Sequence, residues 1–199
     1  MTSDEAWFYL EGMNGVRKIQ HLPMTAKRFE AEVMPVQSHP KGVMVWAAIS
    51  CRGIVGPIFV EAGAKINKDY YIEKVLMPAT EEIKKIYPEM DCLFHQDSAP
   101  AHAAKKTLEF LDSIEMSYIT PNQWVPNSPD CAPCDYFLWG FLKGRVRKRR
   151  AADIEELKQV IRDELGKVPQ SMIDRAIEAM PDRLSEVHAN QGKHLKKRL

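Results

Sequence analysis

A continuous apolar segment, residues 42–50 (GVMVWAAIS), constrains the fold of this 199-residue chain more than any other part of its sequence. Pro40 and Gly53 bound the segment. An uninterrupted apolar run is typical of a strand that is buried on both faces. After a short Cys-Arg-Gly turn, residues 54–61 have the pattern of its hairpin partner. The sequence therefore predicts a hairpin whose first strand lies inside the protein.

Shorter strand patterns lie on both sides of this hairpin. Residues 6–10 are rich in aromatic side chains, and the turn pair Asn14-Gly15 separates them from a partner at 16–22. Residues 91–96 and 115–120 are two further short apolar segments, and we expect a strand in each.

Helical spacing characterises most of the remaining chain. It covers residues 68–87, where Pro78 is expected to bend or divide the helix, and residues 102–111. A third helical stretch begins at Asp135 and ends in a basic run at Arg150. Between the second and third stretches, four prolines within residues 121–133 predict an extended loop.

The last fifty residues have the pattern of a helical extension. Asp153 is a suitable N-cap, with Glu156 in the capping-box position, and Gly166 is a stop signal. A second helix is expected after Ser171, and Pro181 fits the first turn of a third. The order of elements predicts an α/β fold with a C-terminal helical extension, divided into residues 1–150 and 151–199.

Charge is distributed unevenly along the chain. The formal net charge is +1, from 28 basic and 27 acidic residues. Residues 1–139 carry an acidic excess of 5, whereas residues 140–199 carry a basic excess of 6. A near-neutral total taken alone argues against a protein that coats DNA, but the basic C-terminal part leaves room for phosphate contacts.

Several classes of protein are excluded by simple features. The longest apolar stretch, Val43 to Ile49, has seven residues, far fewer than the roughly 20 that a membrane helix needs, so we expect no membrane contact. The N-terminus is acidic, unlike a secretory signal. Four cysteines in such a chain suggest reduced thiols in a cytosolic or nuclear setting.

Three aspartates stand where predicted strands end or helices begin. Asp4 opens the first strand, Asp97 follows residues 91–96, and Asp135 begins a helix. Carboxylates at such positions converge at one edge of an open α/β sheet, and they suit Mg²⁺ or Mn²⁺. From residue types alone, solvated surface acids are the better explanation of three such positions among 27 acidic residues.

Four ordered sequence blocks resemble the mariner-type transposases. The first two are Thr2-Ser3-Asp4-Glu5-Ala6-Trp7 and residues 39–46 (HPKGVMVW) followed by Gly53. The other two are residues 95–102 (HQDSAPAH) and residues 127–136 (NSPDCAPCDY). Thirty-seven residues separate Asp97 from Asp135, a spacing used by one branch of that superfamily.

The resemblance implies a ribonuclease H-like fold, with a mixed sheet and flanking helices, and a catalytic triad at Asp4, Asp97 and Asp135. It implies that these three residues bind two Mg²⁺ or Mn²⁺ ions. Asp130 is the rival for the third position, although by resemblance it shapes the loop. Glu5 is the rival for the first, but on a strand its side chain points to the opposite face from Asp4.

The implied activity is metal-dependent cleavage of DNA phosphodiesters, followed by joining of a 3′-hydroxyl to target DNA. The implied partners are transposon ends and a target duplex in the nucleus, and a homodimer is compatible with the sequence. Two departures from the family are visible: Ser98 replaces the usual Asn, and the chain starts too late for the helix-turn-helix modules. The alternatives are an inactive remnant that acts only by binding, and a cellular nuclease of the same fold.

A basic run lies about two helical turns after Asp135. Its charged members are expected to hold the DNA backbone, although a solvated helix end and nuclear import are alternatives: Lys143, Arg145, Arg147, Lys148, Arg149 and Arg150.

Other residues near the predicted site have less specific patterns. His95 and His102 bracket Asp97 and are expected to pack or hydrogen-bond beside it, with metal or phosphate contact as the alternative. The pair Cys131 and Cys134 lacks further zinc ligands at short spacing, so we interpret both as loop cysteines. Trp124 is expected to be an exposed aromatic contact.

Overall fold

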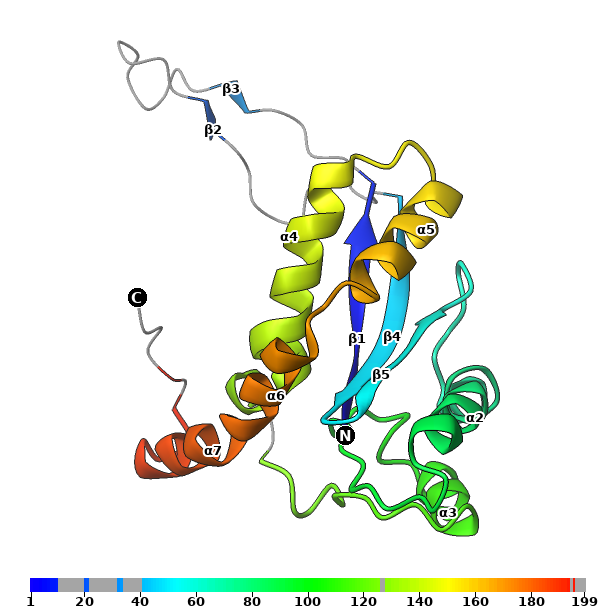
Figure 1. Ribbon diagram of the computed structural model, residues 1–199, viewed down its shortest axis with the longest axis vertical. Helices are drawn as coiled ribbons and strands as arrows, with labels where there is room; N and C mark the ends of the chain where they lie inside the picture. Colours follow the sequence, from blue (N-terminus) through cyan, green and yellow to red (C-terminus); the bar gives the residue numbers. More distant parts are fainter. Residues whose placement is uncertain (11–19, 22–31, 34–40, 126–127, 194, 196–199) are drawn as a thin grey trace.

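An antiparallel sheet of three strands, β1 (Thr2–Tyr9), β4 (Gly42–Ser50) and β5 (Gly53–Phe59), forms the centre of the computed structural model (Figure 1). The structure describes residues 1–10, 20–21, 32–33, 41–125, 128–193 and 195. Strand β4 lies between β1 and β5, and residues 45–49 are completely buried. The predicted hairpin and the burial of its first strand on both faces are confirmed.

The sheet continues past β1 through single parallel bridges. Thr2 pairs with His95, and Phe94 pairs with Tyr118. The predicted strands are therefore reduced to two bridge residues in 91–96 and to one in 115–120. The backbone leaves the sheet after His95, because Asp97 accepts a hydrogen bond from the Ala99 backbone N–H (3.0 Å) and closes a tight turn.

The predicted hairpin partner of the first strand, residues 16–22, falls largely outside the described residues. Its described part, β2 (Gln20–His21), pairs with β3 (Glu32–Val33).

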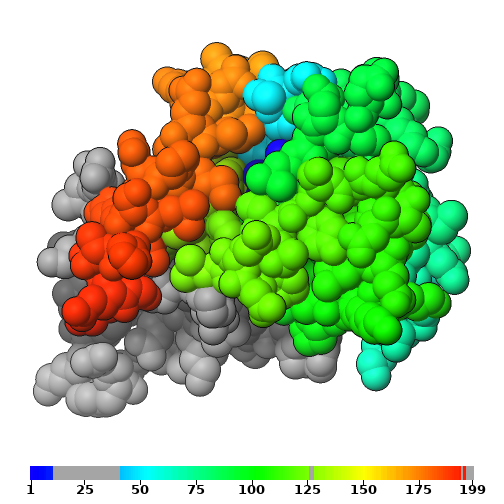
Figure 2. Space-filling model, turned by 90° about the horizontal axis from the view of Figure 1, so that it is seen from below, coloured from blue at the N-terminus to red at the C-terminus, as the bar shows by residue number. Residues whose placement is uncertain are grey.

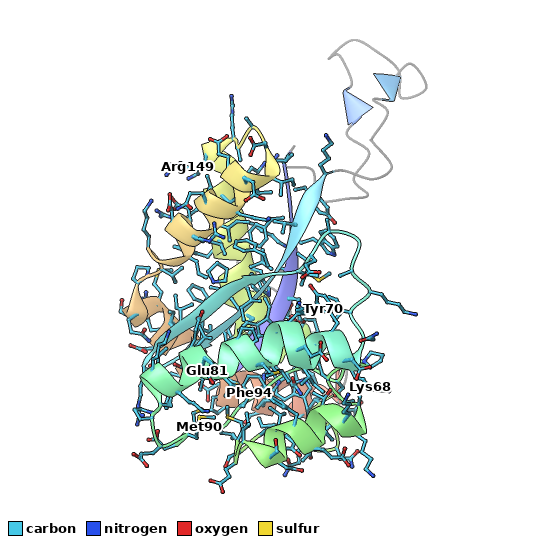
Figure 3. All side chains as sticks on the ribbon, turned by 90° about the vertical axis from the view of Figure 1, so that its right-hand side faces the viewer. Lys68, Tyr70, Glu81, Met90, Phe94 and Arg149 are labelled. Atoms are coloured by element: carbon cyan, nitrogen blue, oxygen red, sulfur yellow. The ribbon has the colours of Figure 1, made fainter. Side chains whose placement is uncertain are left out.

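Two layers of helices cover the two faces of the sheet (Figures 1 and 3). Val45, Ala47 and Ile49 share one apolar cluster with helices α4 (Trp139–Arg149), α5 (Ile154–Leu165) and α6 (Gln170–Glu178). Trp46 and Ala48 share the other cluster with α2 (Met77–Ile86) and the helix before it. The alternation of side chains along β4 therefore supplies both cores.

The helix over residues 68–86 is continuous but changes its hydrogen-bond pattern. It begins as α1 (Lys68–Tyr70), widens into the π-helical segment η2 (Tyr71–Leu76) and continues as α2. Pro78 lies in the first turn of α2. The helix keeps helical dihedral angles through this point, so proline changes the pattern of bonds rather than breaking the helix.

The remaining helices follow the sequence pattern with small shifts at their ends. Helix α3 (Lys105–Ser113) begins three residues later than predicted, and α6 begins one residue before Ser171. The loop before Asp135 contains a short 3₁₀ turn, η3 (Pro129–Cys131), and leads into a second π-helical segment, η4 (Cys134–Leu138). Helix α7 (Met180–Ala189) carries Pro181 in its first turn, as predicted.

The predicted cap of α5 is confirmed. Asp153 accepts a hydrogen bond from the Glu156 backbone N–H (2.8 Å), and the Glu156 carboxylate accepts one from the Ala152 N–H (2.7 Å). In the described part of the chain, no helix is both long and apolar enough to cross a lipid bilayer.

A buried carboxylate ties α4 to α5. Glu164 of α5 is 5% exposed and accepts from Arg145 Nε (2.6 Å), Arg149 Nη1 (3.3 Å) and Lys167 Nζ (2.8 Å). These hydrogen bonds, led by Lys167 and Arg145, lower the pKa of Glu164 to about 2. Two residues of the basic run therefore hold α5 in place.

We expect Glu164→Gln to lower the melting temperature by several degrees near neutral pH, because it removes the charge that three cations share. The folded pKa lies below the ordinary value of 4.5, so the contribution is present above that value and is lost as pH falls toward about 2. The difference between the wild type and the variant should therefore shrink with acidification in thermal melts. Glu155→Gln, an exposed acid of the same helix, is the matched control, and a pH-independent difference would contradict this account.

Candidate active site

Asp4 lies in the third position of β1, not at its opening as predicted, because the strand begins at Thr2. The side chains of Ala6 and Phe8 join the core beneath α4, and Asp4 lies on this same face. Its Oδ2 accepts a hydrogen bond from Trp139 Nε1 of α4 (2.7 Å). The strand and α4 together fix this carboxylate.

Asp135 lies next to Asp4 in the structure, although the two residues are far apart in the sequence. It lies in the first turn of η4, where its backbone N–H donates to the Ala132 carbonyl (2.9 Å). Burial, followed by the charge of Asp135, raises the pKa of Asp4 to about 7. Burial, followed by the charge of Asp97, also raises the pKa of Asp135. The two carboxylates are thus close enough to repel each other.

Asp97 is held by its own loop. Its Oδ1 lies 2.6 Å from Nδ1 of His102 and also accepts the Ala99 N–H. The hydrogen bond with His102 is the main reason why the pKa of Asp97 is lowered. Burial alone would lower the pKa of His102, but hydrogen bonds with Asp97 and Glu5 outweigh it and raise that pKa to about 10.

The three predicted aspartates line one open pocket of about 620 Å³. Its lining also includes Glu5 of β1 and residues of the turn after Asp97 and of the proline-rich loop: Ser98, Ala99, Pro100, Trp124, Ser128, Pro129 and Ala132. Seen from below, this end of β1 is almost covered by the segment around residues 90–135 (green) and by the C-terminal helices (orange) in Figure 2.

The comparisons with known proteins point in one direction. No family model matches the chain. It is 29% identical over 193 residues to the Tc3 transposase of Caenorhabditis elegans, which covers 96% of this chain and 55% of that protein. It is 25% identical over 191 residues to the Tcb2 transposase of Caenorhabditis briggsae, which covers 96% and 67%.

The chain is homologous to Tc1/mariner transposases.

Solved structures of the Mos1 mariner transposase share its fold. A Mos1 paired-end complex with the left transposon end matches with a TM-score of 0.80 and 22% identity, over 98% of this chain and 56% of that one. The Mos1 catalytic domain with raltegravir and Mg matches with a TM-score of 0.74 and 20% identity, over 98% of this chain and 84% of that one. The predicted ribonuclease H-like fold is therefore confirmed. The chain spans about half the length of the Tc3 transposase.

The pocket lined by the three aspartates has oxygen donors of the kind that suit divalent cations. Among the described residues, no group of three His, Cys, Asp or Glu side chains is arranged so that it could hold a metal ion. Asp97 is bonded to His102 and Asp4 to Trp139. Mg²⁺ needs only one or two protein carboxylates and completes its shell with water. The adjacent acids Asp4 and Asp135 meet that requirement, and a cation would relieve their repulsion.

The two rival acids have other contacts. The Asp130 carbonyl accepts a hydrogen bond from Arg183 (2.9 Å), and its Oδ2 accepts the Leu195 N–H (3.1 Å). These bonds tie the loop to the C-terminal region. Glu5 lies on the opposite face of β1 from Asp4, as predicted, with its Oε1 3.3 Å from His102 Nε2.

The basic run divides into separate groups. Lys143 lines a groove beside Asp135, and burial lowers the pKa of its amine while Asp4 and Asp135 raise it. Arg145 and Arg149 pair with Glu164. The others are exposed at the end of α4: Arg147, Lys148 and Arg150.

Trp124 is not the exposed contact that the proline-rich loop predicts. It is 8% exposed, and its ring centroid lies 3.9 Å from that of His95. The apolar side chains that cover it come from α7 and the loop. Cys131 and Cys134 are also buried, as free thiols, and Cys134 Sγ donates to the Thr2 carbonyl (3.4 Å).

Sequence reasoning missed the partners of the aspartates. Nothing in the spacing of Trp139 indicates a bond to Asp4. His102 was expected to make a hydrogen bond near the site, but its link to Glu5 carried no sequence signal.

We expect the metal-free protein to lose stability as pH rises. The pKa of Asp4 in the folded state, about 7, lies above its ordinary value of 3.8, so folding is favoured by protonation and stability falls between about pH 4 and about pH 7. Asp4→Asn should flatten this dependence in EDTA and raise the melting temperature by several degrees near pH 8.

Glu89→Gln, at an exposed acid in the turn after α2, is the control and should leave the dependence unchanged. Equal pH dependence in the wild type and Asp4→Asn would contradict the repulsion.

Proposed function

We propose that this chain is the catalytic part of a transposase, which cleaves DNA phosphodiesters and joins a 3′-hydroxyl to a target duplex. The observation that carries the proposal is the common pocket of Asp4, Asp97 and Asp135 in a ribonuclease H-like fold. The proposal is supported by homology to the Tc3 and Tcb2 transposases, which extends along nearly the whole chain.

We propose that the three aspartates hold two divalent cations, Mg²⁺ or Mn²⁺. Structures of the Mos1 catalytic domain with raltegravir were solved with Mg and with Mn, which supports this choice. Such ions supply an activated nucleophile and stabilise the leaving oxygen of a phosphodiester.

The chain's own residues prepare the site for that chemistry. Asp4 and Asp135 offer the adjacent, mutually repelling carboxylates that a cation neutralises. Both hydrogen bonds that the described residues make to Asp97 end on Oδ1, which leaves Oδ2 as the oxygen for a ligand. Lys143, which lines the groove beside Asp135, is positioned to meet a DNA phosphate.

The proposed partners are transposon ends and a target duplex. Mos1 structures with transposon ends, in paired-end complexes, support both this partner and a homodimer. Within the basic run, we assign phosphate contact to the exposed side chains of Arg147, Lys148 and Arg150, since Arg145 and Arg149 are engaged by Glu164. A DNA substrate implies a nuclear location.

The second candidate is an inactive remnant that binds DNA without cutting it. Loss of activity commonly removes a carboxylate, whereas here all three remain in one pocket. The catalytic function is therefore the better-supported proposal.

We expect Asp97→Ala to abolish cleavage of a supercoiled plasmid in Mn²⁺. Metal-ion catalysis supplies several kcal/mol of transition-state stabilisation, so the rate should fall by roughly 100-fold or more, and EDTA should have the same effect on the wild type. Asp182→Ala, at an exposed acid of α7, is the control. Cleavage that survives Asp97→Ala would refute the proposed site.

We expect the double variant Arg147→Ala/Lys148→Ala to weaken duplex binding and to reduce the salt slope of log K by about 2, since each phosphate contact contributes roughly 1. The matched double variant Arg145→Ala/Arg149→Ala removes the same charge, but it should mainly lower the melting temperature. Fluorescence anisotropy at several salt concentrations measures the first effect and thermal melting the second. The opposite pattern would reverse the assignment.

A further inference from the structure

A buried histidine connects the second aspartate to the strand that carries the first. His102 Nδ1 lies 2.6 Å from Oδ1 of Asp97, and its Nε2 lies 3.3 Å from Oε1 of Glu5. The histidine side chain is 5% exposed and that of Glu5 is 15% exposed. Two carboxylates that are 92 residues apart in the sequence are thus joined through one imidazole.

The orientation of this imidazole is fixed from several sides. The Tyr71 ring lies against it, with the two centroids 4.2 Å apart, and the Tyr71 hydroxyl donates to Gln96 Oε1 (2.7 Å). Gln96 Nε2 donates to the His102 carbonyl (3.4 Å), and the His102 N–H donates to the Ala99 carbonyl (2.9 Å). Tyr71 is completely buried in η2. The ring therefore has little freedom to turn away from Asp97.

The strand provides a common reference for both aspartates. Asp4 and Glu5 are adjacent residues of β1, whose pairing with β4 runs from Thr2 to Tyr9. Asp4 is directed to the α4 face and Glu5 to the opposite face, where His102 lies. A rigid strand that holds Asp4 directly therefore also holds Asp97 through Glu5 and His102.

We propose that His102 is a positioning residue, which ties Oδ1 of Asp97 to Glu5 so that Oδ2 stays available to the cation pocket. This inference rests on the proposed function, since it concerns the geometry of the proposed metal ligands. Partners that orient a ligand typically change metal affinity by about 10- to 100-fold when they are removed.

Two amide substitutions separate the two ends of the imidazole. In His102→Asn, the amide nitrogen is bonded to Cγ as Nδ1 is, so the donor to Asp97 is kept and the contact with Glu5 is lost. In His102→Gln, the amide nitrogen lies one bond further out, near Nε2, so the donor to Glu5 is kept and the bond to Asp97 is lost. Both variants lose the ring that packs on Tyr71, which makes them matched for packing.

The test is a titration of the full chain with Mn²⁺ alone, followed by the electron paramagnetic resonance signal of the free ion. We expect His102→Gln to weaken binding by about 10-fold or more, and His102→Asn to stay within about threefold of the wild type. Equal affinities for the two variants would overturn the proposal, because loss of packing would then explain the effect. Thermal melts of both variants check that they are folded.

Glu5 provides a second test that leaves the buried ring in place. Glu5→Gln keeps an oxygen opposite His102 Nε2, which lies 3.3 Å from Glu5 Oε1, whereas Glu5→Ala removes it. We expect Glu5→Ala to weaken Mn²⁺ binding by no more than the roughly threefold allowed to His102→Asn, since both variants keep the donor to Asp97 Oδ1, and Glu5→Gln to bind as the wild type does. If the wild type binds Mn²⁺ no better than Asp97→Ala, the metal site itself is wrong and the proposed function fails. If Asp97→Ala alone weakens binding while all His102 and Glu5 variants match the wild type, only the positioning role fails.

Discussion

The pairing of β1 with β4 is the constraint on which the candidate site depends. Nine residues of β4 are fixed between two helical layers, and β1 is aligned against them from Thr2 to Tyr9. Because successive side chains of a strand point to opposite faces, this alignment sends Asp4 toward α4 and Glu5 toward η2. The two neighbouring acids of β1 therefore face opposite helical layers, Asp4 toward Trp139 and Glu5 toward His102.

This arrangement destabilises the charged forms of two of the aspartates. Asp4 and Asp135 lie together in a partly buried place, where burial and a neighbouring carboxylate, Asp135 for Asp4 and Asp97 for Asp135, raise the pKa of each. Asp97 differs, since a histidine and a backbone N–H stabilise its charge. The protein therefore stabilises the charge of one aspartate with its own groups and raises the pKa of the other two.

Local sequence patterns predicted the local features of the fold well. The strand at 42–50 and the Asp153 cap depend on residues next to one another, and both are present. The short strands at 91–96 and 115–120 were overestimated, because an apolar run does not reveal how many neighbouring residues it will pair with. The burial of Trp124 depends on α7, more than fifty residues away, and no local pattern reports it. Separation in the sequence likewise hides the link from Glu5 to His102, and the shorter separation of 19 residues is enough to hide the link from Arg145 to Glu164.

The π-helical form of η4 has a consequence for how this chain tolerates changes in length. Its wider turn contains one residue more than an α-helix would use, and Asp135 lies within it. Deleting one residue from this turn would let α4 keep its register and its contacts with the core. The chain on both sides would keep its place, because the wide turn held the extra residue, but Asp135, which lies in that turn, would be redirected away from Asp4. A shortening that the fold absorbs without strain would therefore still dismantle the site.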